Sequence, residues 1–450
     1  MYIMAKTIDM TKGSPIRNLI YFAWPILIGL LFQQVYSLAD KVIVGQFVGD
    51  AAFSAIGTTA AASFIFMSFS QGMSAGSGVV AAQYYGAKDR TGSAKAVING
   101  LYVTSALAVL LTFGGIALTD PLLHLLNTPK NLLADASIYM KIYLGGSLAV
   151  ALYYTPFSIL QAFGDSKTPL IFQIICSALN IVLDILFVIP PLNWGVAGAA
   201  IATVISQVIA AVMCLIYSVK KVPQFQDAFK HLKPDFGVMG QIVRIGVPSG
   251  FQYALLYISS LFLQAIVNGF GETAVGAYTA TTQIEMLAVQ VPNAIAAAML
   301  TYVGQNIGAG KSDRIRKGLK FALLMCAVSS FVMIAVIGVF GKYIMGIFVS
   351  DNAIISMAAT GMFVESFFLI AYSGSRVTLY TLNGAGDSSF SMINGIIEIT
   401  ARIAFGFTLT AIPFIGVWGI WLTTGLTWTV TAATALLRYK SGVWKRKGLV

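Results

Sequence analysis

Acidic residues inside long apolar segments are the clearest chemical signal in this sequence. Asp40 shares one face of a predicted helix with three preceding polar residues, Gln33, Tyr36 and Ser37. On a later apolar segment, Asp184 follows Asn180 by one helical turn. An ionised side chain at the centre of a membrane helix costs about 2.5–3.5 kcal/mol, and those that persist usually face a cavity or a partner. We expect Asp40, Asn180 and Asp184 to converge on one polar pocket.

Two carboxyl groups in such a pocket have more than one possible use. Their mutual repulsion and their desolvation both disfavour the charged forms, so one of the pair could hold a proton near neutral pH. The same oxygens, with the Asn180 carbonyl and a threonine hydroxyl, could instead coordinate Na⁺. The spacing leaves both uses open, together with a structural role in which the cluster only positions helices.

The second half of the chain places a different set of ionisable residues in apolar segments: Glu285, Glu365, Arg376, Glu398 and Arg402. Glu398 precedes Arg402 by four residues, which is the favoured order for an ion pair within one helix. We expect that pair to be mainly structural. Glu285 and Arg376 have no such local partner. They could pair with each other, or Glu285 could meet a cationic ligand.

The composition is that of a membrane protein. Hydrophobic residues make up 57% of the 450 residues and charged residues only 10%, against about 25% in soluble domains. Cys176, Cys214 and Cys326 all lie inside apolar runs, where buried packing is the expected role. Because no catalytic triad, nucleotide-binding loop or metal-ligand cluster occurs, neither an enzyme nor a cofactor is expected. Twelve apolar runs are long enough to span a bilayer: about 17–44, 53–80, 93–119, 134–160, 169–190, 194–219, 239–267, 276–304, 316–341, 354–383, 389–412 and 416–438.

A pattern of glycine, glutamine, aspartate and proline residues in the first half recurs in the second. Five residues of the first half reappear 222 positions later, and Pro25 has a counterpart at Pro248; the matched residues are Gly49, Gln83, Gly86, Gly164 and Asp165, followed by Gly271, Gln305, Gly308, Gly386 and Asp387. Such duplication is typical of transporters that bind substrate between two halves. We expect an all-α membrane fold of two six-helix bundles, with an N-terminal lobe over 1–220, a linker over 221–238 and a C-terminal lobe over 239–450.

Lys and Arg concentrate in alternate loops. One side of the predicted membrane carries most of them, and the other has only Lys130, Lys141 and Lys342. This asymmetry places both termini in the cytoplasm and explains the net charge of +11 without nucleic acid. Because each half has an even number of spans, the halves share one orientation and the repeat is parallel. We expect a monomer in the cytoplasmic (inner) membrane.

Several short motifs, taken in order, resemble the multidrug and toxic compound extrusion (MATE) family over nearly the whole chain. They are Trp24-Pro25, Gln83-Tyr84-Tyr85-Gly86-Ala87, the segment from Gly164 to Pro169, and the segment from Gly195 to Ala200. The resemblance implies export of organic cations and drug-like compounds in exchange for H⁺ or Na⁺ by alternating access.

Within that family the chain looks like the DinF-like branch. That branch has an acidic residue on helix 1, an Asn-x-x-x-Asp pair on helix 5 and a Thr on helix 6. The resemblance therefore implies a cation-coupling site at Asp40, Asn180, Asp184 and Thr203. The NorM-like branch instead has acidic residues on helices 7 and 10, and this chain departs from that pattern.

Further expectations concern the hinge and the substrate. Pro25 leaves a carbonyl unpaired inside helix 1, which makes it a plausible hinge. Candidate cavity residues are Gln33, Tyr36, Ser37, Met67, Tyr153, Tyr257, Glu285, Met286 and Arg376. The alternative function is a flippase for lipid-linked sugars, which would favour several basic residues in its cavity. A membrane receptor or embedded enzyme is disfavoured by the repeat.

Overall fold

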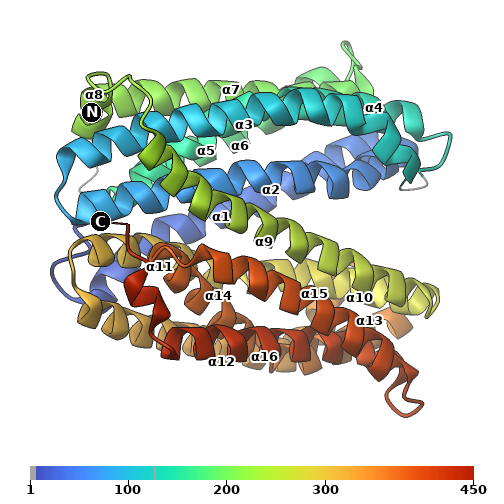
Figure 1. The fold of residues 1–450 in the computed structure, drawn as a ribbon. Helices are drawn as coiled ribbons and strands as arrows, with labels where there is room; N and C mark the ends of the chain where they lie inside the picture. Colours follow the sequence, from blue (N-terminus) through green and yellow to red (C-terminus); the bar gives the residue numbers. More distant parts are fainter. Residues whose placement is uncertain (1–6, 126–127, 450) are drawn as a thin grey trace.

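A computed structural model describes residues 7–125 and 128–449, and gives only the main chain for residues 41, 50–53, 60 and 61. Within that part of the chain the only regular structure is helical. Helices α3 to α7 form one side of the molecule and α10 to α16 the other, with α1, α2 and α9 between them (Figure 1). Both ends of the chain lie at the same end of the molecule, which we call the terminal end.

The first half is built from seven helices and is followed by a short connecting one. Their bounds are α1 Pro15–Phe47, α2 Asp50–Gly86, α3 Arg90–Leu125, α4 Leu133–Gly145, α5 Ser147–Ala162, α6 Lys167–Val188 and α7 Gly195–Lys221, with α8 Pro223–Ala228 in the connection.

The second half repeats this order. Its helices are α9 Phe236–Asn268, α10 Glu272–Ala288, α11 Gln290–Gly308, α12 Ser312–Met345, α13 Asn352–Ser366, α14 Leu369–Gly384, α15 Ser388–Ala411 and α16 Gly419–Lys440, with short 3₁₀ turns at Gly416–Trp418 and Val443–Arg446.

The helices account for the expected membrane spans. Among the described residues, eight helices are long and apolar enough to cross a bilayer, and three bent pairs qualify when each pair is taken as one span. The pairs α4–α5, α10–α11 and α13–α14 bend by 45°, 40° and 50°. Helix α2, with 37 residues, completes the twelve spans, six in each half.

The repeated glycines make equivalent turns. Gly49 and Gly271 have φ angles of 111° and 85°, and each directly precedes the second helix of its half. Gly164 and Gly386 have φ angles of 88° and 89°, in the turns after α5 and α14. Residues with a Cβ rarely adopt these angles, so glycine is required at each turn. The predicted internal repeat is therefore confirmed in the backbone.

Helices α2 and α9 bring the two halves into close contact. A Cβ atom at Gly72 would overlap the main chain of Gly250, and one at Gly76 would meet the main chain of Ile242 and Gly246. Apolar side chains gain little from helix association in lipid, so small residues that let backbones approach closely stabilise such contacts. Gly72 and Gly76 thus form a packing surface for α9.

A second contact between the halves lies nearer the terminal end, and we call it the glutamine seam: Gln83, Gly86, Gln305 and Gly308. The Nε2 atom of Gln83 donates a hydrogen bond of 3.0 Å to the carbonyl of Gly384. By the same repeat relation, the Nε2 atom of Gln305 donates one of 2.8 Å to the carbonyl of Ala162. A Cβ at either glycine would overlap the carbonyl oxygen of the opposite glutamine.

The two ends of the chain complete this seam. The Met10 N–H donates to Oε1 of Gln305 at 2.9 Å. The Leu449 N–H donates to Oε1 of Gln83 at 2.8 Å. Each terminal segment therefore crosses to a glutamine of the other half, and both the nitrogen and the oxygen of each amide group are hydrogen-bonded.

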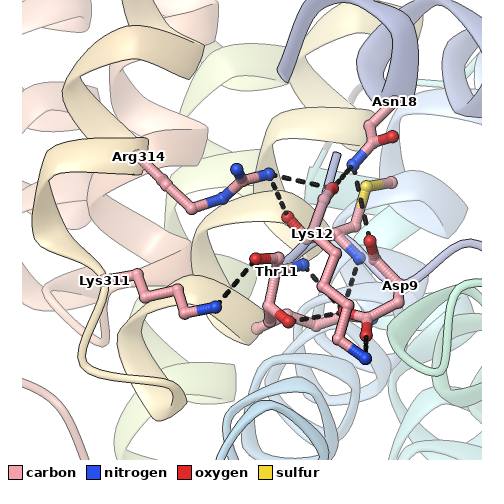
Figure 2. A network of polar contacts seen from close by, with 8 residues as sticks. Asp9, Thr11, Lys12, Asn18, Lys311 and Arg314 are labelled. Atoms are coloured by element: carbon pink, nitrogen blue, oxygen red, sulfur yellow. Dashed lines mark hydrogen bonds and ion pairs between the residues drawn. The ribbon is translucent and has the colours of Figure 1, made fainter. Parts of the chain in front are cut away.

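Basic residues at the start of α12 hold the N-terminal segment in place (Figure 2). Lys311 donates to the Thr11 carbonyl at 2.9 Å. The Arg314 guanidinium donates to the carbonyls of Met10, Lys12 and Gly13 at 3.1, 3.1 and 2.9 Å. Because every acceptor is a main-chain oxygen, this contact fixes the path of the segment rather than its side chains.

The connection between the halves is anchored to α3. Asp227 of α8 pairs with Arg90, and Asp235 pairs with Lys95 at 2.9 Å. The hydrogen bond from Lys95 holds the pKa of Asp235 below its ordinary value. Asp235 also accepts from the first N–H groups of α9, as an N-cap residue does. The expected linker between the halves is therefore held against α3 by two ion pairs.

The close contact at the glutamine seam predicts that a side chain added at either of its glycines lowers the stability of the protein. We expect Gly86→Ala and Gly308→Ala each to destabilise the protein by about 1–3 kcal/mol, because the new Cβ forces main chains apart. The measurement is thermal unfolding of the purified protein in detergent. Gly240→Ala is the matched control, since a Cβ on that α9 glycine meets open space. Equal unfolding temperatures for all three variants and the wild type would contradict tight packing at the seam.

Candidate functional site

A central cavity of about 490 Å³ lies between the two halves. Its walls come from α1, α2, α5 and α6 of the first half and from α9, α11 and α14 of the second. Pro25 and Gln33 of α1 line it, as do Tyr257 of α9 and Arg376 of α14. The volume falls within the range of about 300–1,000 Å³ that is usual for drug-sized ligands.

Aromatic rings form much of the cavity wall. Phe64 of α2 stacks on Tyr257 across the two halves, with ring centroids 4.6 Å apart. Tyr154 and Phe157 of α5 face the cavity from the first half. Such rings offer flat apolar surface to a ligand without requiring one fixed orientation.

Beside the cavity, the first half holds the predicted carboxyl pair. Asp184 of α6 is fully buried, and its carboxyl group is within hydrogen-bonding reach of that of Asp40 on α1. One turn earlier on α6, the Nδ2 atom of Asn180 donates to the Thr203 hydroxyl at 3.3 Å. The structure thus brings together the four residues that the resemblance assigns to cation coupling.

The hydrogen-bonding state of this cluster is unusual. Neither carboxyl oxygen of Asp184 accepts a hydrogen bond from an amide or hydroxyl group of the described residues, and nor does Oδ1 of Asn180. Buried polar atoms are nearly always paired, so three unpaired acceptor oxygens in one place need an explanation. A proton or a monovalent cation bound at Asp184 would give these oxygens a partner. The described residues contain no set of three His, Cys, Asp or Glu arranged for a transition metal.

Polar side chains connect this cluster with the central cavity. Gln33 lines both the cavity and a small polar space of about 20 Å³, which Asn180 and Thr203 also line. Gln33 contacts the Tyr154 hydroxyl, and Tyr36 lies next to Asp40. Rearrangement at the carboxyl pair can therefore reach the cavity wall through α1.

The second half holds a separate charged cluster. Glu398 and Arg402 of α15 form the expected ion pair at 3.2 Å. The Glu285 carboxyl of α10 meets the Glu365 carboxyl of α13. In the described part of the chain no ion pair joins Glu285 to Arg376; such a pair is one of the two possibilities that the sequence left open for them.

The remaining candidates fall in different environments. Tyr153 is buried and donates to Gln173 at 3.0 Å, beside the small polar space. Met67 is packed in the core of the first half, and Met286 is 46% exposed. Neither methionine lines the central cavity, and nor does Ser37. Lys41, set beside Asp40 in the sequence, has a side chain outside the described residues.

Several cavity residues were not anticipated. Gln71 of α2, Gln161 of α5 and Asn293 of α11 place amide groups on the wall, and Tyr253 meets Tyr380 there through their hydroxyls at 3.3 Å. Isolated polar residues in otherwise apolar helices are the signal that could have found them. Their convergence depends on how the helices are rotated, which spacing within one helix does not give.

Comparison with known proteins decides the family. A family model described as MatE matches this chain twice, over residues 25–186 and 248–408. The chain belongs to the MatE family. The two matches begin at the helix prolines Pro25 and Pro248 and so follow the internal repeat. Membership confirms the predicted transporter fold and excludes an enzymatic role.

Full-length relatives of this MatE protein are found in bacteria. It is 27% identical over 441 residues to the probable multidrug resistance protein YpnP of Bacillus subtilis (strain 168), covering 98% of both chains. It is 23% identical over 426 residues to the multidrug export protein MepA of Staphylococcus saprophyticus, covering 94% of this chain and 92% of that one. A solved outward-facing structure of a multidrug resistance MATE family transporter has the same fold, with a TM-score of 0.91 at 22% identity and coverage of 98% and 99%.

The unpaired oxygens of Asp184 predict an unusual stability effect. We expect Asp184→Asn to unfold at or above the wild-type temperature in detergent, because it removes a buried acid that no amide or hydroxyl donor satisfies. Asp387→Asn is the matched control. Asp387 is equally buried, but its carboxylate accepts two hydrogen bonds from Arg438, at 2.8 and 3.1 Å. Losing them should cost about 1.5–3 kcal/mol. A drop for Asp184→Asn as large as that for Asp387→Asn would show that Asp184 is a structural residue.

Proposed function

We propose that this protein exports drug-like organic compounds across the cytoplasmic membrane by antiport with H⁺ or Na⁺. The observation that carries the proposal is the cluster of unpaired acceptor oxygens at Asp184 and Asn180, facing Asp40 beside a drug-sized cavity. Buried acceptor oxygens that can take up an ion, set next to a substrate cavity, are what ion-coupled transport requires.

The relatives support the transport half of this proposal. YpnP and MepA are named for multidrug resistance and multidrug export, and both align over nearly the full length of this chain. Organic cations are the substrates that the family resemblance implies. The rings of Phe64, Tyr154 and Tyr257 could hold the apolar part of such compounds.

The proposed mechanism couples charge to the shape of α1. Binding of the ion at Asp40 and Asp184 neutralises the repulsion between the carboxyl groups and draws α1 toward α6. Pro25, which lines the cavity within α1, interrupts the helical hydrogen bonds and lets the helix bend there. Bending changes the cavity wall and releases the substrate outside, and the ion is discharged inside.

The charge distribution supports a membrane orientation for this cycle. With most Lys and Arg on the terminal side, both termini lie in the cytoplasm. The glutamine seam then closes the cytoplasmic end of the cavity, and alternating access requires that it open. Transport by a single chain is sufficient for this mechanism, because both halves are present in one polypeptide.

The flippase alternative has weaker support. A cavity for a phosphate-bearing lipid would favour several basic side chains. Among the described residues that line the central cavity, only Arg376 is basic.

The decisive experiment is dye efflux from proteoliposomes under a pH gradient or a Na⁺ gradient imposed separately. The dyes are a cationic and an anionic one of similar size. We expect one gradient to drive efflux of at least one dye, and Asp40→Asn to abolish it, because the coupling ion loses a carboxylate. Thermal unfolding of the variant confirms that it is folded. Efflux that ignores both gradients, or that survives Asp40→Asn, would overturn the antiport mechanism.

A further inference from the structure

The charge of the central cavity differs from the charge of the membrane helices as a whole. The apolar parts of those helices hold five acidic residues that the sequence singles out, yet none of them is among the described residues lining the central cavity; they are Asp40, Asp184, Glu285, Glu365 and Glu398. In that set Arg376 of α14 is the sole charged side chain. A ligand in the cavity therefore meets one guanidinium and no carboxylate.

Arg376 is held by one edge only. Its Nε atom donates to the Tyr372 hydroxyl at 3.2 Å, and its guanidinium lies 5.3 Å from the centre of the same ring. Tyr372 is fixed in turn, because its hydroxyl donates to Asn293 at 2.9 Å. Arg376 forms no ion pair in the described part of the chain, and no hydrogen bond from its two terminal nitrogens reaches a described residue. The outer edge of the guanidinium is thus free to bind a ligand.

Other charged groups lie near Arg376, and they are largely occupied with one another. Arg402 forms an ion pair with Glu398 at 3.2 Å. The carboxyl groups of Glu285 and Glu365 lie close to each other. Glu285, Glu398 and Arg402 border, with Arg376, a side cavity of about 120 Å³.

The free edge of a guanidinium has a definite chemical preference. Two parallel N–H donors match the two oxygens of a carboxylate, sulfonate or phosphate, and such charge-assisted pairs are about twice as strong as neutral hydrogen bonds. The rest of the wall is aromatic and amide in character, with Phe64, Tyr154 and Tyr257 among its rings. Aromatic rings alone can attract cations, but here a cation would share the cavity with the positive charge of Arg376.

We propose that the central cavity selects aromatic organic anions, with Arg376 binding the acidic group and the aromatic wall holding the ring system. The inference rests on the proposed function, since it takes this cavity as the transport site. It names a substrate class opposite in charge to the organic cations implied by the family resemblance. Tyr372 and Asn293 are positioning residues for the guanidinium.

Binding to the purified full chain in detergent tests this directly. The probes share one xanthene scaffold: fluorescein, which is anionic, and a rhodamine ester, which is cationic. We expect fluorescein to bind at least tenfold more tightly than the ester, and Arg376→Gln to remove that preference. Arg376→Lys should keep part of the preference for fluorescein, since lysine has the positive charge but not the two parallel N–H donors of the guanidinium. Arg244→Gln, which alters an exposed arginine outside the cavity, should change neither affinity.

A second measurement needs no variant and so does not depend on the folding of Arg376→Gln. Benzenesulfonate and benzyltrimethylammonium, which are similar in size and opposite in charge, compete with fluorescein for the wild-type protein. Stronger competition by the sulfonate supports the proposal. Stronger competition by the ammonium compound, or a tighter affinity for the rhodamine ester that Arg376→Gln leaves unchanged, overturns it.

Transport separates this inference from the function on which it rests. Gradient-driven efflux of the rhodamine ester but not of fluorescein would retain the antiporter and refute anion selection. Preferential binding of fluorescein without efflux of either dye would retain Arg376 as an anion site and refute the transport function.

Discussion

The structure depends on two places where helices from opposite halves touch backbone to backbone. Glycines make both contacts possible: Gly72 and Gly76 of α2 against α9, and Gly86 and Gly308 at the glutamine seam. In lipid, close approach and hydrogen bonding replace much of the hydrophobic drive that holds soluble proteins together. The cavity between the halves and the stacking of Phe64 on Tyr257 depend on how these contacts set the two halves.

The polar groups of this protein divide into two kinds. At the seam every amide atom of Gln83 and Gln305 is used, and Asp387 is satisfied twice by Arg438. At Asp184 and Asn180 the acceptor oxygens are buried without donors. Satisfied groups hold a structure in place, whereas unsatisfied ones raise its free energy until something binds. The contrast is consistent with the ion site proposed at Asp184 and Asn180.

Sequence reasoning reached the parts of this structure that local spacing controls. The repeated glycines predicted the turns, and the i, i+4 relations predicted the Glu398–Arg402 pair and the shared face of Asn180 and Asp184. Contacts between side chains of different helices were harder to predict. The sequence left open whether Glu285 pairs with Arg376 or meets a cationic ligand. Its carboxyl lies near that of Glu365, a contact that spacing along one helix does not give because it does not fix the rotation of the helix toward its neighbours. For the same reason the charge of the central cavity could not be predicted. The sequence shows which apolar helices carry acidic residues, but not which of those side chains line the cavity.

The crossing of the chain ends gives the seam a particular symmetry. Each glutamine bonds a carbonyl of its partner half at positions that the repeat makes equivalent, Gly384 and Ala162. The second bond of each set comes from one end of the polypeptide, at Met10 for Gln305 and at Leu449 for Gln83. Contacts made twice about an axis are the mark of an isologous interface. The carbonyl bonds of the seam follow that symmetry, whereas the segments that complete it are the N-terminal one on one side and the C-terminal one on the other, so the two sides of the seam are alike in chemistry but not in chain connection.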